Sequence, residues 1–91
     1  MKKLFKRHYQ AIICRGLIND NTEPHEFLDK LKEEHSELLM AYGYGTNDEL
    51  KQELIDVMMV VVNFCQYLGV DVEKELIKNI EVQENRAIKT K

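Results

Sequence analysis

The sequence has few of the residues that interrupt helices. It contains one proline, Pro24, and four glycines among its 91 residues. No stretch alternates apolar and polar residues for long enough to predict a strand. Two cysteines, Cys14 and Cys65, are far apart and lack the spacing of a zinc site, which favours reduced, buried thiols. These absences exclude a β fold and a disulfide-stapled scaffold, and they favour a single all-α domain over residues 1–91.

The chain also lacks a strong excess of one charge and a long apolar run. Its formal net charge is −3, so bulk charge gives no reason to expect a nucleic-acid partner. The longest apolar run, residues 54–68, is interrupted by Asp56, Asn63 and Gln66 and is too short and polar to span a membrane. The basic start has no apolar segment of the kind that signal peptides contain. We therefore expect a cytoplasmic protein that binds neither nucleic acid nor a membrane.

Glycine, proline and capping residues divide the chain into four predicted helices. Thr22 or Glu23 is expected to cap the second helix, and Asn47 or Asp48 the third. Short connections of this kind favour antiparallel neighbours, as in a four-helix unit. The four predicted helices run over about residues 3–15, 24–41, 48–68 and 71–88.

The third predicted helix is apolar on nearly all sides. Leu54, Val57 and Val61 belong to one broad face, and Ile55 and Met59 lie on the opposite face. A helix of this kind is buried on nearly all sides. Three other short helices in a chain of this length barely provide that cover. We therefore predict that the fold is completed by oligomerisation, as a homodimer or a homotetramer.

Acidic residues interrupt the apolar faces of the second and third helices. On a helical wheel, Glu34 falls within the apolar stripe of the second helix and Glu37 lies at its edge, while Glu33 points toward solvent. On the third helix, Glu53 and Asp56 interrupt the apolar surface in the same way. The pairs Glu34/Glu37 and Glu53/Asp56 both have the i, i+3 spacing that places side chains on one face.

Two antiparallel helices bring such pairs together. Converging carboxylates repel one another and lose hydration, so buried acids are paired with cations or bind metal. Only Lys30 lies near either acidic strip, at its edge. A cluster of oxygen ligands without histidine or cysteine favours Mg²⁺, with Mn²⁺ as the alternative. The sequence thus predicts a metal site formed by Glu34, Glu37, Glu53 and Asp56.

The motif Glu33-Glu34-x-x-Glu37, followed after a glycine turn by Glu53-x-x-Asp56, resembles the EExxE…ExxD signature of MazG-like nucleotide pyrophosphohydrolases. These belong to the all-α NTP pyrophosphatase superfamily, and the resemblance covers about residues 24–88. It implies a four-helix MazG-like unit that uses Mg²⁺ to split nucleoside triphosphates into monophosphate and pyrophosphate. It also implies assembly as a dimer or tetramer.

The resemblance further implies roles for individual residues. Glu34, Glu37, Glu53 and Asp56 correspond to the metal ligands, and Glu33 to an additional acid beside the site. Glu33 or Glu37 is the candidate general base for the attacking water. The candidate substrate-binding residues combine amides with cations that suit phosphate; they are Asn63, Lys78, Asn79, Arg86 and Arg15.

Two alternatives stay open. A phosphoribosyl-ATP pyrophosphohydrolase belongs to the same superfamily, but that family usually has glycine immediately before the paired acids, where this chain has Lys32. A non-catalytic helical dimerisation module would explain the apolar third helix. It would not explain why Glu34 and Glu53 interrupt apolar faces.

Overall fold

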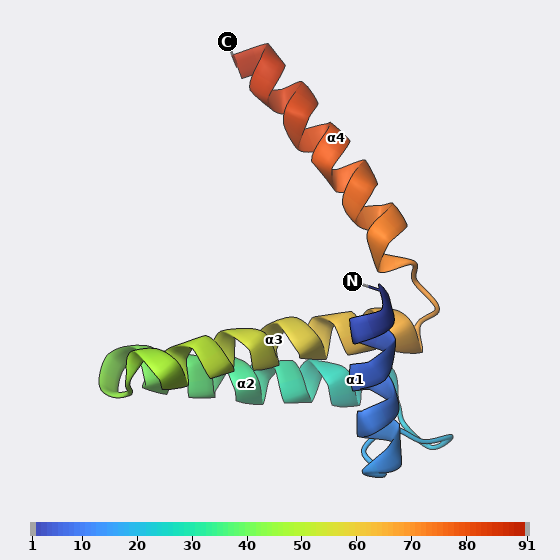
Figure 1. Ribbon diagram of the computed structural model, residues 1–91, viewed down its shortest axis with the longest axis vertical. Coiled ribbons are helices and arrows are strands. Elements are labelled where there is room, and N and C mark those ends of the chain that lie inside the picture. Colours follow the sequence, from blue (N-terminus) through green and yellow to red (C-terminus); the bar gives the residue numbers. More distant parts are fainter. Residues whose placement is uncertain (1, 91) are drawn as a thin grey trace.

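Two antiparallel helices lie side by side at the centre of the structure, a computed structural model that describes residues 2–90 (Figure 1). They are α2, Pro24–Tyr44, and α3, Asn47–Tyr67. Helix α1, Lys2–Cys14, crosses this hairpin near the start of α2 and the end of α3. Helix α4, Val72–Thr90, leads away from it. The described residues form four helices and no strand, so the predicted all-α fold class is confirmed.

The beginning of α2 follows from a reciprocal capping arrangement. The Glu23 side chain accepts from the backbone of Glu26, and the Glu26 side chain accepts from the Glu23 backbone N–H. Pro24 occupies the first helical position, where no N–H is required. Two N–H groups that the helix itself leaves unpaired are thereby satisfied, as predicted for a cap at Glu23.

The turn between α2 and α3 differs from the predicted one at both ends. Helix α2 continues through Gly43 to Tyr44, and its end is marked by the Gly45 N–H donating to the carbonyl of Ala41 at 3.0 Å. Neither Asn47 nor Asp48 caps α3. The cap is Thr46, whose Oγ1 accepts from the Glu49 N–H at 3.1 Å. The hydroxyl reaches the third helical residue, so the helix starts two residues earlier than a cap at Asp48 would require.

Two glycines end helices in the left-handed backbone region. Gly16 follows α1 with φ +75° and Gly69 follows α3 with φ +74°, values that residues with a Cβ rarely adopt. Both helix ends were predicted from these glycines. The expectation of two buried thiols is wrong for Cys14, which is exposed, whereas Cys65 is half-buried.

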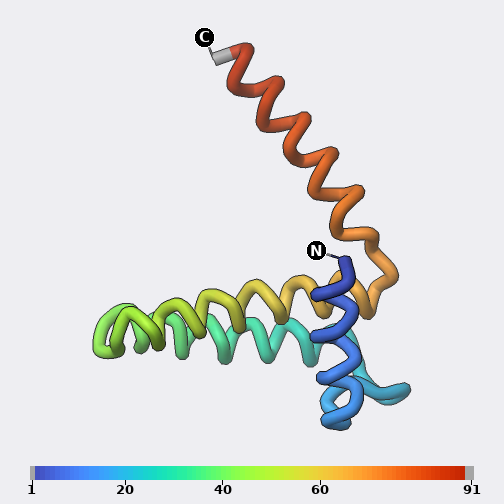
Figure 2. Tube along the Cα trace, in the orientation of Figure 1, coloured from blue at the N-terminus to red at the C-terminus, as the bar shows by residue number. Residues whose placement is uncertain are grey.

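Helix α4 does not fold back along α3. The two helix directions differ by 113°, so antiparallel packing holds for α2 and α3 but not for α3 and α4. The start of α4 is held beside α1, because Lys2 Nζ lies 3.7 Å from Asp71 Oδ2 and 3.2 Å from Glu73 Oε2. The radius of gyration is 15.7 Å, against about 12 Å for a compact domain of this length. Helix α4 extends away from the hairpin (Figure 2), and this extension accounts for the larger radius.

The core is thin and lies where α1 meets the hairpin. Phe27 stacks on Phe64 with ring centroids 4.8 Å apart and packs at a tilt against Tyr67 at 4.9 Å. The Tyr67 hydroxyl donates to the Thr22 carbonyl at 2.6 Å and ties the end of α3 to the start of α2. No described side chain is less than 2% exposed. One chain therefore encloses little apolar volume.

Much apolar surface of α3 and α4 is correspondingly uncovered. On α3, Ile55 and Met58 are 54% and 44% exposed, and on α4 Ile77 is 53% exposed. The exposed apolar side chains of α3 thus agree with the prediction that a single chain cannot cover this helix. Within residues 2–90, no single helix is both long and apolar enough to cross a membrane. Helices α3 and α4 meet these two criteria only when they are counted together, and they are bent by 113° at the turn between them.

Candidate metal and nucleotide site

The acidic residues predicted on α2 and α3 converge across the helical hairpin. Carboxylate oxygens of Glu34, Glu53 and Asp56 lie within 4.8 Å of one another. A second set, Glu33, Glu34 and Glu37, meets the same limit, with Glu34 common to both. The i, i+3 spacing and the antiparallel pairing of the helices together produce this arrangement. The geometry therefore brings together the five acids that the motif singled out.

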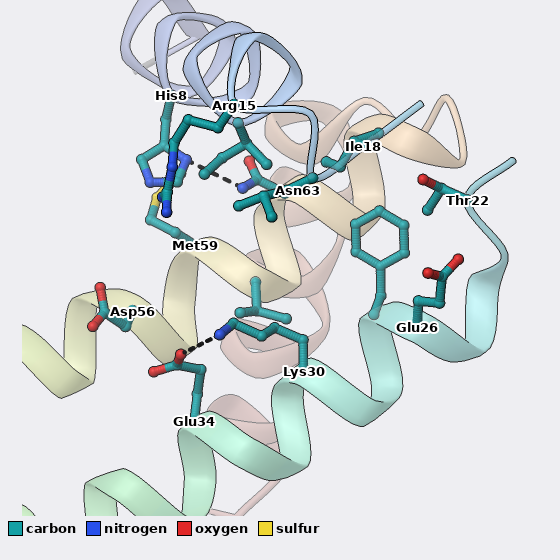
Figure 3. A pocket seen from close by; sticks show the side chains of 14 residues that line it. His8, Arg15, Ile18, Thr22, Glu26, Lys30, Glu34, Asp56, Met59 and Asn63 are labelled. Atoms are coloured by element: carbon teal, nitrogen blue, oxygen red, sulfur yellow. Dashed lines mark hydrogen bonds and ion pairs between the residues drawn. The ribbon is translucent and has the colours of Figure 1, made fainter. Parts of the chain in front are cut away.

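Glu34 is the most enclosed of these acids. Its side chain is buried, Glu53 is half-buried, and Glu33, Glu37 and Asp56 are exposed. Lys30 Nζ lies 3.1 Å from Glu34 Oε1 (Figure 3). It also lies 3.4 Å from Glu33 Oε1. This ammonium compensates at most one of the five negative charges. The cluster retains a strong local excess of negative charge after that pairing.

Two carboxylate oxygens in the cluster have no hydrogen-bond partner. They are Glu34 Oε2 and Glu53 Oε2, both buried among the described residues. A buried carboxylate oxygen without a partner is costly unless a cation or a proton satisfies it. Hard divalent cations bind such oxygen ligands. These residues therefore fit the Mg²⁺ ion that the family resemblance implies.

The pKa shifts within the cluster have the same cause. The pKa of Glu53 is raised above its ordinary value by desolvation, then by the neighbouring Glu34, Glu37 and Asp56 carboxyl groups. The pKa of Glu37 is raised chiefly by the negative charge of Glu34, with smaller contributions from desolvation and Glu33. Lys30 acts in the opposite direction on Glu37 but does not overcome it. Without a metal, Glu37 and Glu53 thus hold protons more tightly than isolated carboxyl groups do.

A cavity of about 470 Å³ adjoins the acids. Glu34 and Asp56 lie at one side of it, and His8 and Arg15 enter it from α1 and the residue just after it (Figure 3). Its volume falls within the range of pockets that hold small molecules. Its wall also includes apolar residues that suit a nucleobase or sugar; they are Ile12, Leu17, Ile18, Phe27, Met59 and Val60.

The predicted substrate-binding residues are divided between two places. Asn63 is buried and lines the cavity, and Arg15 lines it as well. Lys78, Asn79 and Arg86 lie on α4, which leads away from the cluster of the same chain (Figure 1). Lys78 pairs with Glu75 at 3.4 Å. A role for these three in substrate binding stays a prediction, and in this arrangement it requires a second chain.

Two cavity residues were not predicted as part of the site. Lys30 was noticed only at the edge of the acidic strip, although its position four residues before Glu34 places the two side chains on one face. The second is His8, which no ligand spacing in the sequence marks as a site residue. It is half-buried and hydrogen-bonded to Asn63, 55 residues along the chain. No local spacing in the sequence gives that contact.

The all-α hairpin with acids on its facing helices is the arrangement expected of the MazG-like all-α NTP pyrophosphatase superfamily. Comparison with known proteins gives the family. A family model described as phosphoribosyl-ATP pyrophosphohydrolase matches residues 17–84, and the chain belongs to that family. No curated protein and no solved structure matches the chain. It is thus a member of a family of pyrophosphohydrolases, which act on phosphoanhydride bonds of nucleotides.

The family match supports the phosphoribosyl-ATP pyrophosphohydrolase alternative more strongly than the sequence motifs do. The resemblance holds at the level of the MazG-like superfamily, while the matching family is the first of the two alternatives given above. The sequence departs from that family's usual pattern at Lys32, which stands in place of glycine. Lys32 is exposed on α2, so its side chain extends into solvent without disturbing the hairpin. Lysine at this position is therefore compatible with the fold.

Proposed function

We propose that this protein is a Mg²⁺-dependent nucleoside triphosphate pyrophosphohydrolase. It adds water across the α–β phosphoanhydride bond of an NTP or dNTP, so that one monophosphate and one pyrophosphate are formed. The observation that carries this proposal is the pair of buried, unpartnered oxygens, Glu34 Oε2 and Glu53 Oε2, beside a cavity of nucleotide size. Membership of a pyrophosphohydrolase family supports it.

The residues present suit the parts of this reaction. Glu34, Glu37, Glu53 and Asp56 would hold the metal, with Mn²⁺ as a second ion of the same preference. When bound, Mg²⁺ supplies positive charge that neutralises phosphoryl oxygens. Glu33 and Glu37 are exposed at the margin of the cluster, where solvent water has access. Glu33 or Glu37, at this margin, would accept the proton of the attacking water.

A second substrate class is favoured by the family match. Phosphoribosyl-ATP carries the same triphosphate chain as ATP and differs at the base, so the same acids would serve both substrates. The apolar and polar side chains that line the cavity would distinguish the two substrates by their nucleoside parts. The chemistry of cleavage is thus common to both proposals, and only the nucleoside part separates them.

A product assay tests the reaction and the substrate together. Purified protein is incubated with Mg²⁺ and, separately, with the NTPs, the dNTPs and phosphoribosyl-ATP, and the products are separated by ion exchange. We expect pyrophosphate and the corresponding monophosphate, and the highest kcat/KM names the substrate class. Release of orthophosphate and a diphosphate would reject α–β cleavage. Absence of turnover of every nucleotide would favour the non-catalytic dimerisation module.

A further inference from the structure

A hydrogen-bonded chain of side chains links α1 to α3 at the cavity. Gln66 Nε2 lies 3.1 Å from the Phe5 carbonyl oxygen and 3.3 Å from Asn63 Oδ1. Asn63 Nδ2 lies 3.1 Å from His8 Nδ1. Asn63 is buried, and Gln66 and His8 are half-buried. Each of these groups therefore depends on its neighbours more than on solvent for hydrogen bonding.

The direction of every bond in this chain is determined by its first member. A backbone carbonyl only accepts, so Gln66 must present its NH₂ group to Phe5. The same NH₂ group donates to Asn63, which must therefore present its oxygen to Gln66 and its own NH₂ group to His8. An amide NH₂ only donates. His8 Nδ1 must consequently be an acceptor, and the proton of the neutral imidazole is on Nε2.

The imidazole thus has one polar atom left for other partners, the Nε2–H donor. His8 lines the cavity together with Arg15 and the apolar wall. Asn63 follows Asp56 by seven residues on α3, which is about 10 Å along a helix axis. His8 therefore lies at a distance from the acids that corresponds to the nucleoside part of a nucleotide whose phosphates are at Glu34 and Asp56.

We propose that His8 is a specificity-determining residue whose Nε2–H donates a hydrogen bond to an acceptor atom of the substrate's nucleoside part. This proposal rests on the proposed function for the identity of the ligand. Asn63 and Gln66 are positioning residues in it: they act through His8 by holding the ring and its tautomer. A nucleoside carbonyl oxygen, ring nitrogen or sugar oxygen is the kind of acceptor that such a donor selects.

Two substitutions separate this role from a merely structural one. His8→Gln places a side-chain NH₂ near the position of Nε2 but lacks the acceptor that Asn63 uses. His8→Asn keeps a polar group near Nδ1 and lacks a donor at Nε2. Loss of one neutral hydrogen bond corresponds to about three- to tenfold in binding. We expect His8→Asn to raise KM by that factor for the preferred nucleotide with little change in kcat, and His8→Gln to restore KM toward that of the native protein.

A control variant and a spectroscopic measurement complete the test. His25→Asn changes an exposed histidine on α2 outside the cavity and should leave KM unchanged. ¹⁵N NMR of the native protein should show His8 with an unprotonated Nδ1 and a protonated Nε2 in the absence of nucleotide. The NMR measurement of the His8 tautomer requires no catalytic turnover, so its result is independent of the proposed function. A protonated Nδ1, or a KM that is better preserved by His8→Asn than by His8→Gln, would overturn the assignment.

Discussion

The α2–α3 hairpin and α4 are built from helices of similar length, yet they differ in what covers their apolar residues. The hairpin helices have 21 residues each and α4 has 19. In the hairpin, Phe27, Met59 and Val62 are buried, and so is Glu34. On α4, Ile77 and Ile80 remain about half exposed. One chain thus assembles the acidic cluster by itself, whereas it leaves much of the apolar surface of α4 uncovered.

Assembly of the acidic cluster and burial of the apolar surface therefore depend on different parts of the structure. The acids need only the pairing of two adjacent helices, which a short turn and the cap at Thr46 provide. The apolar residues of α4 are left largely uncovered in a single chain, and the predicted oligomer would cover them. Four experiments, from the largest expected effect to the smallest, test the acidic cluster of the hairpin and the uncovered apolar surface. A last experiment tests the metal site itself.

The largest effect is expected from the centre of the hairpin. Glu34→Gln removes the carboxylate that belongs to both acidic groups, while keeping its size. Because it would remove a direct metal ligand, we expect kcat/KM for the preferred nucleotide to fall by more than about 100-fold. The matched control is Asp29→Asn, which neutralises an exposed acid on the same helix and should stay close to the native value. Equal activities of the two variants would remove Glu34 from the site.

The second experiment concerns the uncovered surface. We expect the native protein at micromolar concentration to sediment with at least twice the chain mass of 10.7 kDa. Met58→Glu introduces a charge on the exposed apolar side of α3 and should lower the observed mass toward that of one chain. Leu4→Glu makes the same kind of change on α1 and serves as the control. A native protein that is a folded monomer would contradict the predicted assembly.

The third experiment compares two neighbouring residues of α2. Phe27 is 7% exposed and stacks on Phe64, whereas Leu28 is 55% exposed. Phe27→Ala should lower the free energy of unfolding by about 3 kcal/mol, and Leu28→Ala by less than about 1 kcal/mol. Urea unfolding at equal protein concentration measures both, since assembly makes stability depend on concentration. Similar losses would show that Leu28 is buried in an assembly.

The fourth experiment uses the raised pKa of Glu37 in the metal-free protein. A carboxyl group whose pKa is higher in the folded state stabilises the fold when protonated, at a pH below its ordinary pKa of 4.5, and this contribution is lost as the pH rises through the folded-state pKa. Glu37→Gln does not titrate. With chelator present, the melting temperatures of the two proteins should agree below pH 4.5 and separate above it, with the variant higher. Parallel curves would mean that Glu37 does not experience the other acids.

The sequence predicted the hairpin and its acids well because local patterns control them. The spacing of Glu34, Glu37, Glu53 and Asp56 determines which face they share, and glycine and capping residues limit the helices to within a turn. The direction of α4 was not predictable in the same way. At the start of α4, Lys2 pairs with Asp71 and Glu73, contacts between distant parts of the chain that no local pattern gives.

The remainder of the cavity depended on contacts between distant parts of the chain. His8 and Asn63 are 55 residues apart, and their hydrogen bond exists only because α1 crosses the end of α3. Arg15 was predicted for its charge, and its place at the cavity follows from the same crossing. The substrate class was likewise beyond the motif, since the acids suit any triphosphate. The family match fits phosphoribosyl-ATP, which the sequence had left as an alternative substrate, at least as well as the other triphosphates.

The metal site itself is tested most directly by melting curves of the native protein and of Glu53→Gln, with and without Mg²⁺ at matched ionic strength. A ligand bound only by the folded state stabilises it by RT ln(1 + [L]/Kd), so Mg²⁺ should raise the melting temperature of the native protein. Glu53 has a buried oxygen without a partner and a raised pKa, so the variant without metal should be at least as stable as the native protein. Its Mg²⁺-dependent rise should shrink or vanish. Equal rises in the two proteins would contradict a metal site that includes Glu53.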